Sequence, residues 1–238
     1  MSDQFPVVFR DGKAIVYRVS DMSLITDDFV RKLEWPQGVK ACIFTFDRPM
    51  SDEVALTSRV TYSADFSFHI RYGAEKEWLD PAPPAAAGVK AAELPLDLHK
   101  VLYLKIKNRI FSQLPWMKEN PGEDREELQK VERGISRYKV GYWEKDGVPA
   151  GLIALKKWRS IRAEPVDWIS WLLVEEELPP EARAAVHAHL RGWLRANMET
   201  RVECVVQSFN ARSLKFFRRM GFRAEAVHIY DERRNERV

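Results

Sequence analysis

The stretch Asn210-Ala-Arg-Ser-Leu-Lys-Phe-Phe-Arg-Arg-Met-Gly221-Phe222 decides the fold of this chain. Asn210 is a residue type that caps helix N-termini, because its side-chain oxygen accepts a hydrogen bond from a backbone N–H of the first turn. Gly221 suits the left-handed position that follows the last residue of many helices. Apolar runs that are typical of strands precede and follow the segment, at 202–208 and 222–230. The stretch therefore predicts a helix between two strands.

Upstream of this stretch, the hydrophobic period changes repeatedly between that of a helix and that of a strand. Asp146-Gly147 is a hairpin turn signal between two apolar runs. The predicted elements before Asn210 are, in order, helices at 97–114 and 120–135, strands at 138–143, 150–156 and 166–174, a helix at 179–198 and a strand at 202–208. This order predicts an α/β (α+β) fold in which helices flank a mixed sheet.

The run from Asn210 to Gly221-Phe222, together with the Asp146-Gly147 hairpin, resembles the core of the GNAT superfamily of acyl-CoA N-acyltransferases. The resemblance extends from residue 97 to the end of the chain. It implies that an acyl group passes from acetyl-CoA or another acyl-CoA to an amine. It also implies that the pantetheine arm lies in a split between the parallel strands at 166–174 and 202–208. The acyl-CoA contacts that the resemblance implies are Leu173, Val174, Arg183, Ala184, Gln207, Asn210, Ser213 and Phe217. For Asn210, helix capping alone and capping combined with a ligand contact both stay open.

The segment Glu175–Ala185 departs from the pattern of that family. GNAT proteins usually bind the CoA pyrophosphate with a glycine-rich turn, whose backbone N–H groups approach the phosphates closely. This segment contains no glycine, and Pro179 and Pro180 remove two N–H donors. Glutamates at 175, 176, 177 and 181 add negative charge. Arg183 is the residue that can partly compensate for these losses.

The candidate catalytic residues also differ from those of the family. Ser170 and Trp171 stand at the strand positions from which GNAT enzymes often supply a glutamate as base. Asp167 and Glu175, near the two ends of the same strand, are candidates for a base that acts through water. The usual acid, a tyrosine, is replaced by Phe217, and Tyr230 is the candidate substitute. Trp168 and Trp171 are three residues apart in a strand and are therefore expected on opposite faces.

Residues before the segment Asp80–Gly88 form a separate β-rich part. That segment contains three prolines and no large apolar side chain, which is typical of a linker. The predicted division is a small β-rich domain at 1–80, a Pro/Ala linker at 81–96 and the GNAT-like domain at 97–238. The predicted N-terminal strands are Pro6–Arg10, Lys13–Val19, Val39–Phe46, Val54–Tyr62 and Phe66–Tyr72, with a short helix at Thr26–Glu34. The segment Phe66–Tyr72 either closes an N-terminal barrel or joins the acyltransferase sheet.

The segment Asp21-Met-Ser23-Leu-Ile-Thr26 is weakly similar to the PilZ barrel, a family that binds cyclic di-GMP. Thr26 stands where that motif has glycine, and the upstream arginines Arg10 and Arg18 have a different spacing. An ordinary turn built on Asp21 and Ser23 is the alternative that the residues favour.

The bulk composition gives further expectations. The formal charge of +3 over 238 residues is nearly neutral, which argues against nucleic acid as the partner. Cys42 and Cys204 are too few for a disulfide scaffold or a zinc site, so no metal is expected. Without a signal peptide or a long apolar run, we expect a cytoplasmic protein that does not enter membranes. Two main functions remain open: an N-acyltransferase for an unidentified small-molecule or protein amine, and a catalytically degenerate GNAT-like protein that senses a ligand or binds a protein partner. A cyclic-dinucleotide receptor, built on the N-terminal domain, is the minor third alternative.

Overall fold

The computed structural model describes residues 6–10, 14–19, 25–33, 35–39, 41–50, 66–79, 88–111, 128–129, 132, 135–160, 164–199 and 201–231. The chain divides into two compact units. Unit 1 comprises Met1–Gly73 and Val205–Val238, and unit 2 comprises Ala74–Cys204. The domain limits predicted from the sequence stay a prediction. Two strands pass from one unit into the other: β4 (Phe66–Glu75) and β9 (Arg201–Gln207).

Unit 2 contains a mixed sheet with the strand order β9-β8-β7-β6-β5. Its strands are β5 (Val89–Ala91), β6 (Lys139–Lys145), β7 (Val148–Arg159), β8 (Pro165–Val174) and the start of β9. Strands β5 to β8 pair in antiparallel fashion, whereas β8 and β9 are parallel. Asp146 and Gly147 have φ values of 54° and 77°, as a two-residue hairpin turn of type I′ requires. The predicted hairpin and the parallel strand pair are both confirmed.

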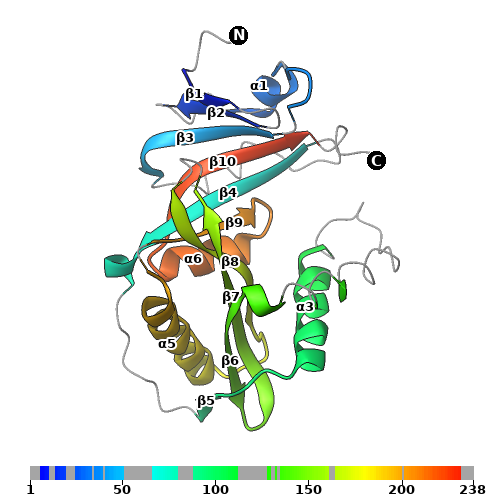
Figure 1. Ribbon diagram of the computed structural model, residues 1–238, viewed down its shortest axis with the longest axis vertical. Helices are drawn as coiled ribbons and strands as arrows, with labels where there is room; N and C mark the ends of the chain where they lie inside the picture. The colour runs from blue at the N-terminus through cyan, green and yellow to red at the C-terminus, as the bar shows by residue number, and fades with distance from the viewer. Residues whose placement is uncertain are drawn as a thin grey trace. The chain divides into compact units, whose positions relative to one another are not determined.

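Helices α3 and α5 lie on opposite faces of the unit 2 sheet (Figure 1). Helix α5 (Pro180–Asn197) connects β8 to β9 and buries the apolar stripe that includes Val186, Leu190 and Leu194. Helix α3 (Leu96–Phe111) contributes Leu102 to a core cluster with Leu152 and Leu173 of the sheet. Short 3-10 helices occur at Lys76–Trp78 (η3) and Ile135–Arg137 (η4). Most of the predicted helix at 120–135 lies outside the described residues; 128, 129 and 132 are helical.

Unit 1 contains strands from both ends of the chain, in the order β1-β2-β3-β10-β4. Its strands are β1 (Val7–Arg10), β2 (Ala14–Val19), β3 (Ala41–Met50), β10 (Arg223–Asp231) and most of β4. Strands β1 and β2 are antiparallel, whereas β2 and β3 are parallel. The connection between β2 and β3 includes helix α1 (Asp27–Arg31), in which Thr26 accepts a capping hydrogen bond from the N–H of Phe29. Val30 of α1 packs in a core cluster with residues of β2, β3 and β10.

Strand β4 answers a question that the sequence left open. It pairs in antiparallel fashion with β10, the strand that follows the Asn210–Gly221 stretch. The predicted strand Phe66–Tyr72 therefore joins the last strand of the acyltransferase segment. The predicted strand Val54–Tyr62 and the PilZ-like residues Asp21 and Ser23 lie outside the described residues.

The expected mixed α/β fold with helices beside the sheet is confirmed. In the described part of the chain, no helix is both long and apolar enough to span a bilayer.

Candidate functional site

Strand β8, the central strand of the expected acyl-CoA site, is irregular at Ser170. Its neighbours Ile169 and Trp171 pair with Leu155 and Ala154, which are consecutive residues of β7. Ser170 is therefore an extra residue in the ladder, which is a β-bulge, and such bulges occur often beside functional sites. The Ser170 hydroxyl is buried and has no hydrogen-bond partner in the described part of the chain.

The bulge corrects one expectation. Trp168 and Trp171 pair with Lys156 and Ala154, two residues of β7 that point to the same face. The two tryptophans therefore share a face of the sheet, contrary to the prediction, because the extra residue at Ser170 shifts the alternation. The Trp171 ring is surrounded by aromatic neighbours, with ring centroids at 5.1 Å for His99, 5.3 Å for Tyr103 and 4.5 Å for Tyr138.

The ladder between the parallel strands β8 and β9 is short. It consists of two residue pairs, Asp167 with Val202 and Trp168 with Glu203, at the start of both strands. A split between these strands requires parallel pairing that stops early, and this ladder has that form.

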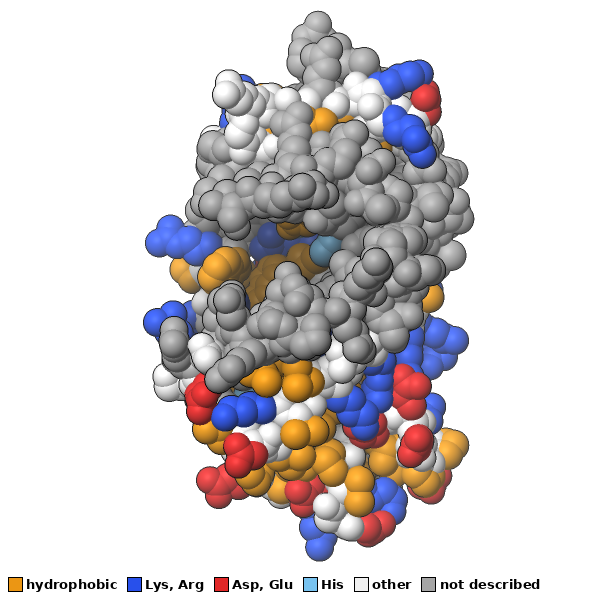
Figure 2. Space-filling view, turned by 90° about the vertical axis from the view of Figure 1, so that its right-hand side faces the viewer, with side chains coloured by type: hydrophobic (Ala, Val, Ile, Leu, Met, Phe, Trp, Pro, Cys, Tyr) orange, Lys and Arg blue, Asp and Glu red, His pale blue; other side chains and the backbone are white. Residues whose placement is uncertain are grey.

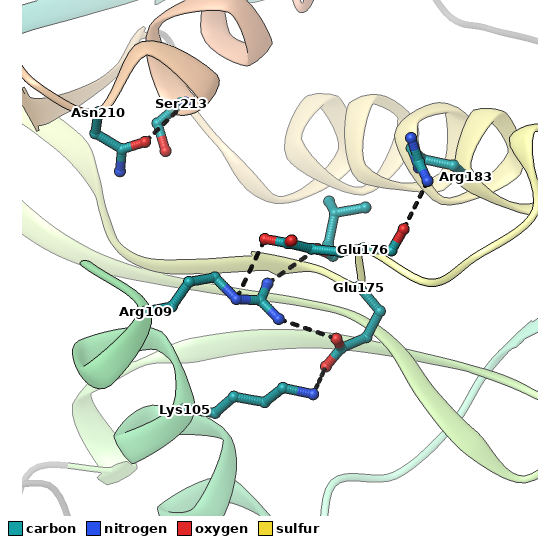
Figure 3. A network of polar contacts seen from close by, with 8 residues as sticks. Lys105, Arg109, Glu175, Glu176, Arg183, Asn210 and Ser213 are labelled. Carbon is teal, nitrogen blue, oxygen red and sulfur yellow. Dashed lines mark hydrogen bonds and ion pairs between the residues drawn. The ribbon is translucent and has the colours of Figure 1, made fainter. Parts of the chain in front are cut away.

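Glu175 follows directly after β8 and is held by two cations of helix α3 (Figure 3). Its carboxylate lies 2.6 Å from Lys105 Nζ and 3.2 Å from Arg109 Nη2. Arg109 also contacts the carboxylate of Glu176, with 3.4 Å between Nε and Oε1, and its Nη1 donates to the carbonyl of Val174 at 3.4 Å. The Glu175 side chain is 12% exposed. These contacts link helix α3 to the end of β8. They also occupy both carboxylate oxygens of Glu175.

Sequence reasoning missed Lys105 and Arg109. A signal was present, since the two residues are four apart on one helical face and the acidic run Glu175–Glu177 needs cations nearby. The pattern does not say which basic face meets the acidic run, because the segments are far apart in sequence.

Arg183 closes the turn that leads into α5. Its Nη2 donates to the carbonyls of Glu176 at 2.7 Å and Leu178 at 3.0 Å, and its Nε is buried without a partner in the described part of the chain. The side chain thus stabilises a turn that has no glycine. Its predicted contact with a CoA phosphate, like that of the exposed Ala184, stays a prediction.

Asp167 lies at the opposite end of β8 from Glu175. It is 3% exposed, and its carboxylate contacts Lys157 Nζ at 3.1 Å and accepts from the backbone N–H of Glu199 at 2.9 Å. At about 3.3 Å per residue, the two ends of β8 are roughly 25 Å apart, so the two candidate bases cannot act on the same atom.

In unit 1, Asn210 caps helix α6 (Ala211–Arg219) as predicted. Its Oδ1 accepts from the backbone N–H of Ser213 at 3.1 Å, and its own backbone N–H donates to Gln207 at 3.0 Å. The structure thus brings together three of the predicted acyl-CoA contacts. The Nδ2 amide group of Asn210 makes no hydrogen bond within the described residues.

The C-terminal half of the same stretch is structural. Gly221 has a φ of 94°, the left-handed conformation that was expected after the helix. Phe217 and Phe222 are buried and pack edge to face at 5.1 Å, and Phe217 also stacks on Tyr72 at 5.9 Å. Phe217 thus serves as a core residue, and its predicted contact with a ligand stays a prediction.

Tyr230, the candidate acid, lies on β10 in unit 1. Its hydroxyl is 3.3 Å from Nδ1 of His228, and its ring contacts the ring of His69 at 5.1 Å between centroids. The surrounding histidines were not among the predicted site residues.

No group of His, Cys, Asp and Glu side chains suited to a metal ion occurs among the described residues. On the face drawn in Figure 2, basic side chains are interspersed with acidic and hydrophobic ones and do not form one large patch of a single sign.

This chain is similar to several solved structures, but its sequence matches no known family or curated protein. One similar structure is a functionally unknown conserved protein from Staphylococcus epidermidis ATCC 12228, with 12% identity, 96% of this chain and 94% of that chain covered, and a TM-score of 0.48. A GCN5-related N-acetyltransferase from Kribbella flavida has 15% identity, with 92% and 80% covered and a TM-score of 0.43. A GCN5-related N-acetyltransferase from Sphaerobacter thermophilus has 13% identity, with 95% and 76% covered and a TM-score of 0.43.

At these identities and TM-scores, the likeness carries no argument about what this chain binds or catalyses. The chain's own topology does bear on the fold: an antiparallel hairpin β6–β7, an antiparallel β8, a crossover through α5 to a parallel β9, and the Asn210-capped α6. At the level of the fold, the chain resembles the GNAT superfamily. The order of these elements, the β6–β7 hairpin and the parallel β8–β9 pair are those that the sequence predicted, whereas the antiparallel pairing of β8 with β7 was not predicted.

Proposed function

We propose that this chain is a GNAT-type N-acyltransferase that binds acetyl-CoA or another acyl-CoA along β8 and transfers the acyl group to an amine. The observation that carries the proposal is the form of β8. Its parallel ladder with β9 has two pairs, and the strand then bulges at Ser170. Peptide groups that leave a ladder at such a point can hydrogen-bond a ligand.

The acyl-CoA contacts follow from this placement. A pantetheine arm carries amide groups, which pair with free backbone groups and with side-chain amides. The amide nitrogen of Asn210 supports the proposal, since its oxygen caps α6 and its nitrogen has no partner in the described part of the chain. A thioester carbonyl beside the Ser170 bulge would give the buried hydroxyl of that residue the partner it lacks.

The reaction is a substitution at the thioester carbon. The amine nitrogen forms the new C–N bond, the C–S bond breaks, one proton leaves the nitrogen, and the CoA thiolate takes up a proton. Glu175 is the proposed acceptor of the first proton, through water, because it lies at the carboxyl end of β8. Because its carboxylate is paired with Lys105 and Arg109, an ion pair must open before water can reach Glu175, so we expect slow turnover. Tyr230 is the proposed proton donor.

A second candidate function is a GNAT-like protein without turnover that senses a ligand or binds a protein. The turn from Glu175 to Pro179 favours it. Arg183 donates to two backbone carbonyls of this turn, and Arg109 pairs with the carboxylate of Glu176. The turn has no glycine that would let a pyrophosphate approach its backbone N–H groups. Phe217, which carries no acidic proton, favours it too.

A pair of variants at Asn210 tests acyl-CoA binding without confusing it with stability. Asn210→Asp keeps an oxygen that caps α6 and removes the N–H donor, whereas Asn210→Ala removes both. We expect Asn210→Asp to weaken acetyl-CoA binding about tenfold with little change in stability, because one hydrogen bond to a ligand is lost. Asn210→Ala should also lower the free energy of unfolding by about 1 kcal/mol.

Calorimetric titration gives the dissociation constants, and thiol release from acetyl-CoA across a panel of amines reports turnover. Binding that Asn210→Asp leaves unchanged would contradict the proposed contact. Binding without thiol release for any amine would favour the sensor.

A further inference from the structure

The end of strand β7 contains two consecutive lysines with different surroundings. Successive side chains of a strand point to opposite faces, so Lys156 and Lys157 lie on opposite faces of the sheet. Lys157 Nζ contacts the carboxylates of Asp167 at 3.1 Å and Glu199 at 2.7 Å. Lys156 has no carboxylate partner in the described part of the chain, and its Nζ lies 4.3 Å from the ring centroid of Trp158. One lysine is thus held by two anions, whereas the other lies on an aromatic ring.

The side chains next to Lys156 on its own face are aromatic. Lys156 pairs with Trp168 of β8, and directly opposite residues of antiparallel strands share a face. Trp158 shares that face because it is two residues further along β7. One strand beyond Trp168, Glu203 of β9 carries a negative charge, and it is held by Arg201 Nε at 3.0 Å. The nearest carboxylate on this face therefore belongs to another cation.

These surroundings favour the neutral amine of Lys156 over that of Lys157. Burial lowers the pKa of Lys156. Burial acts on Lys157 as well, but its hydrogen bonds and charge interactions with Glu199 and Asp167 raise the pKa of Lys157 above its ordinary value. Only a neutral amine attacks a carbonyl carbon, and lysines that are nucleophiles are those with a lowered pKa. At a given pH, Lys156 is therefore the more nucleophilic of the two.

Lys156 is also within reach of an acyl donor. It is only partly buried, and Trp158 beside it is 54% exposed, so a donor can approach the amine from solvent. Trp168, its partner on β8, is in the last residue pair of the ladder with β9, and the bulge at Ser170 follows two residues later. Lys156 is therefore adjacent to the part of β8 along which acyl-CoA binding is proposed.

We propose that Lys156 is a site of acylation on this chain, whose side-chain amine accepts the acyl group of an acyl-CoA. The choice of acyl-CoA as the donor rests on the proposed function. The ammonium group first loses a proton to water, and the neutral nitrogen attacks the thioester carbon. The C–N bond forms, and the C–S bond breaks with its electron pair on sulfur. The nitrogen loses a second proton to water, and the CoA thiolate takes up a proton. The product is an amide without the positive charge of the lysine.

Peptide mass spectrometry of the full chain after incubation with acetyl-CoA tests this proposal, with Lys157 as the internal control. At pH 8, we expect the initial rate of acetylation at Lys156 to exceed that at Lys157 at least about tenfold, since one unit of pKa changes the fraction of neutral amine tenfold. A rate at Lys156 equal to that at Lys157, or lower, overturns the proposal.

Calorimetric titration of the same protein with acetyl-CoA separates this proposal from the proposed function. Acetyl-CoA that binds and leaves Lys156 unmodified overturns the acylation site and leaves the proposed function in place. Absence of binding contradicts the proposed function, and the ratio of the two acetylation rates still decides whether Lys156 is the acylated residue.

Variants at exposed positions add a second criterion. Lys156→Arg keeps the charge and should remove the acetyl group from this peptide. Glu199→Gln, at a side chain that is 73% exposed, takes one of the two carboxylates away from Lys157. We expect it to raise the rate at Lys157 about threefold and to leave the rate at Lys156 unchanged, because a carboxylate partner stabilises the charged amine. An acetyl group that persists in the Lys156→Arg peptide, or equal changes at both lysines in Glu199→Gln, overturns the proposal.

Discussion

His99 and His228 are buried histidines whose surroundings disfavour a positive charge. Burial lowers the pKa of His99, and burial, together with Arg71 and His69, lowers the pKa of His228 well below the ordinary value. In the unfolded chain both rings titrate near pH 6.5. Above that value neither state binds the proton. As the pH falls below it, the unfolded chain binds protons that the folded chain does not, so the folded state loses stability.

We therefore predict that the free energy of unfolding falls between pH 7 and pH 5.5, by up to about 1.4 kcal/mol per pH unit for each of the two histidines. Urea unfolding in buffers without phosphate or carboxylate measures this. In His228→Gln the dependence on pH should become shallower, with the contribution of His99 remaining. An equally steep profile in the variant would show that His228 is protonated in the folded chain.

Residues whose role depends on their immediate neighbours were predictable from the sequence. Asn210 as a helix cap and Gly221 as a left-handed residue follow from local chemistry, and both are confirmed. The partners of Glu175 were not predictable, since Lys105 and Arg109 are about 70 residues away and only the folded chain selects them. The His69–His228 pair was missed for the same reason, because its strands come from opposite ends of the chain.

Helix α5 packs closely on the sheet of unit 2 because two strands have glycine where it crosses. A Cβ atom at Gly151 would lie 2.6 Å from Cγ1 of Val186, and one at Gly141 would lie 2.8 Å from Cε2 of Trp193. Both distances are shorter than van der Waals contact. Gly192, within α5, has no atom within 4 Å of such a Cβ position.

We predict that Gly151→Ala lowers the free energy of unfolding by about 1–3 kcal/mol, because the added methyl group forces α5 away from β7. Gly192→Ala is the matched control and should raise it by about 0.5–1 kcal/mol, since alanine favours the helix and meets no obstacle. Urea denaturation of the three proteins gives both values. Equal effects of the two substitutions would contradict the close packing.

Among the elements, hydrophobic period and turn signals predicted most of the described strands and helices. The bulge at Ser170 was not predicted, because an alternating sequence pattern does not reveal one extra residue in a ladder. This bulge places Trp168 and Trp171 on the same face, not on opposite faces as predicted. The strand order of unit 1 was not predicted either. Pairing between β4 and β10 depends on contacts that are distant in sequence, which local periodicity does not encode.

At the scale of the whole molecule, the residues that were predicted to contact acyl-CoA come from both units. Unit 2 holds Leu173, Val174, Glu175 and Arg183, and unit 1 holds Gln207, Asn210 and Ser213. The resemblance to GNAT proteins predicted the scaffold, whereas the departures at the turn after β8 and at Phe217 predicted altered chemistry. In the proposed function, the scaffold still binds an acyl-CoA along β8.

Backbone and side-chain amide NMR of the full chain, titrated with acetyl-CoA, tests this claim most directly. We predict saturable changes in the chemical shifts of the backbone amides of Ile169–Val174 and of the side-chain amide of Asn210. The signals of the backbone amides of Ile15 and Val16 on β2 should not change. No shifts at millimolar acetyl-CoA, or shifts that leave β8 and Asn210 unaffected, would contradict the account.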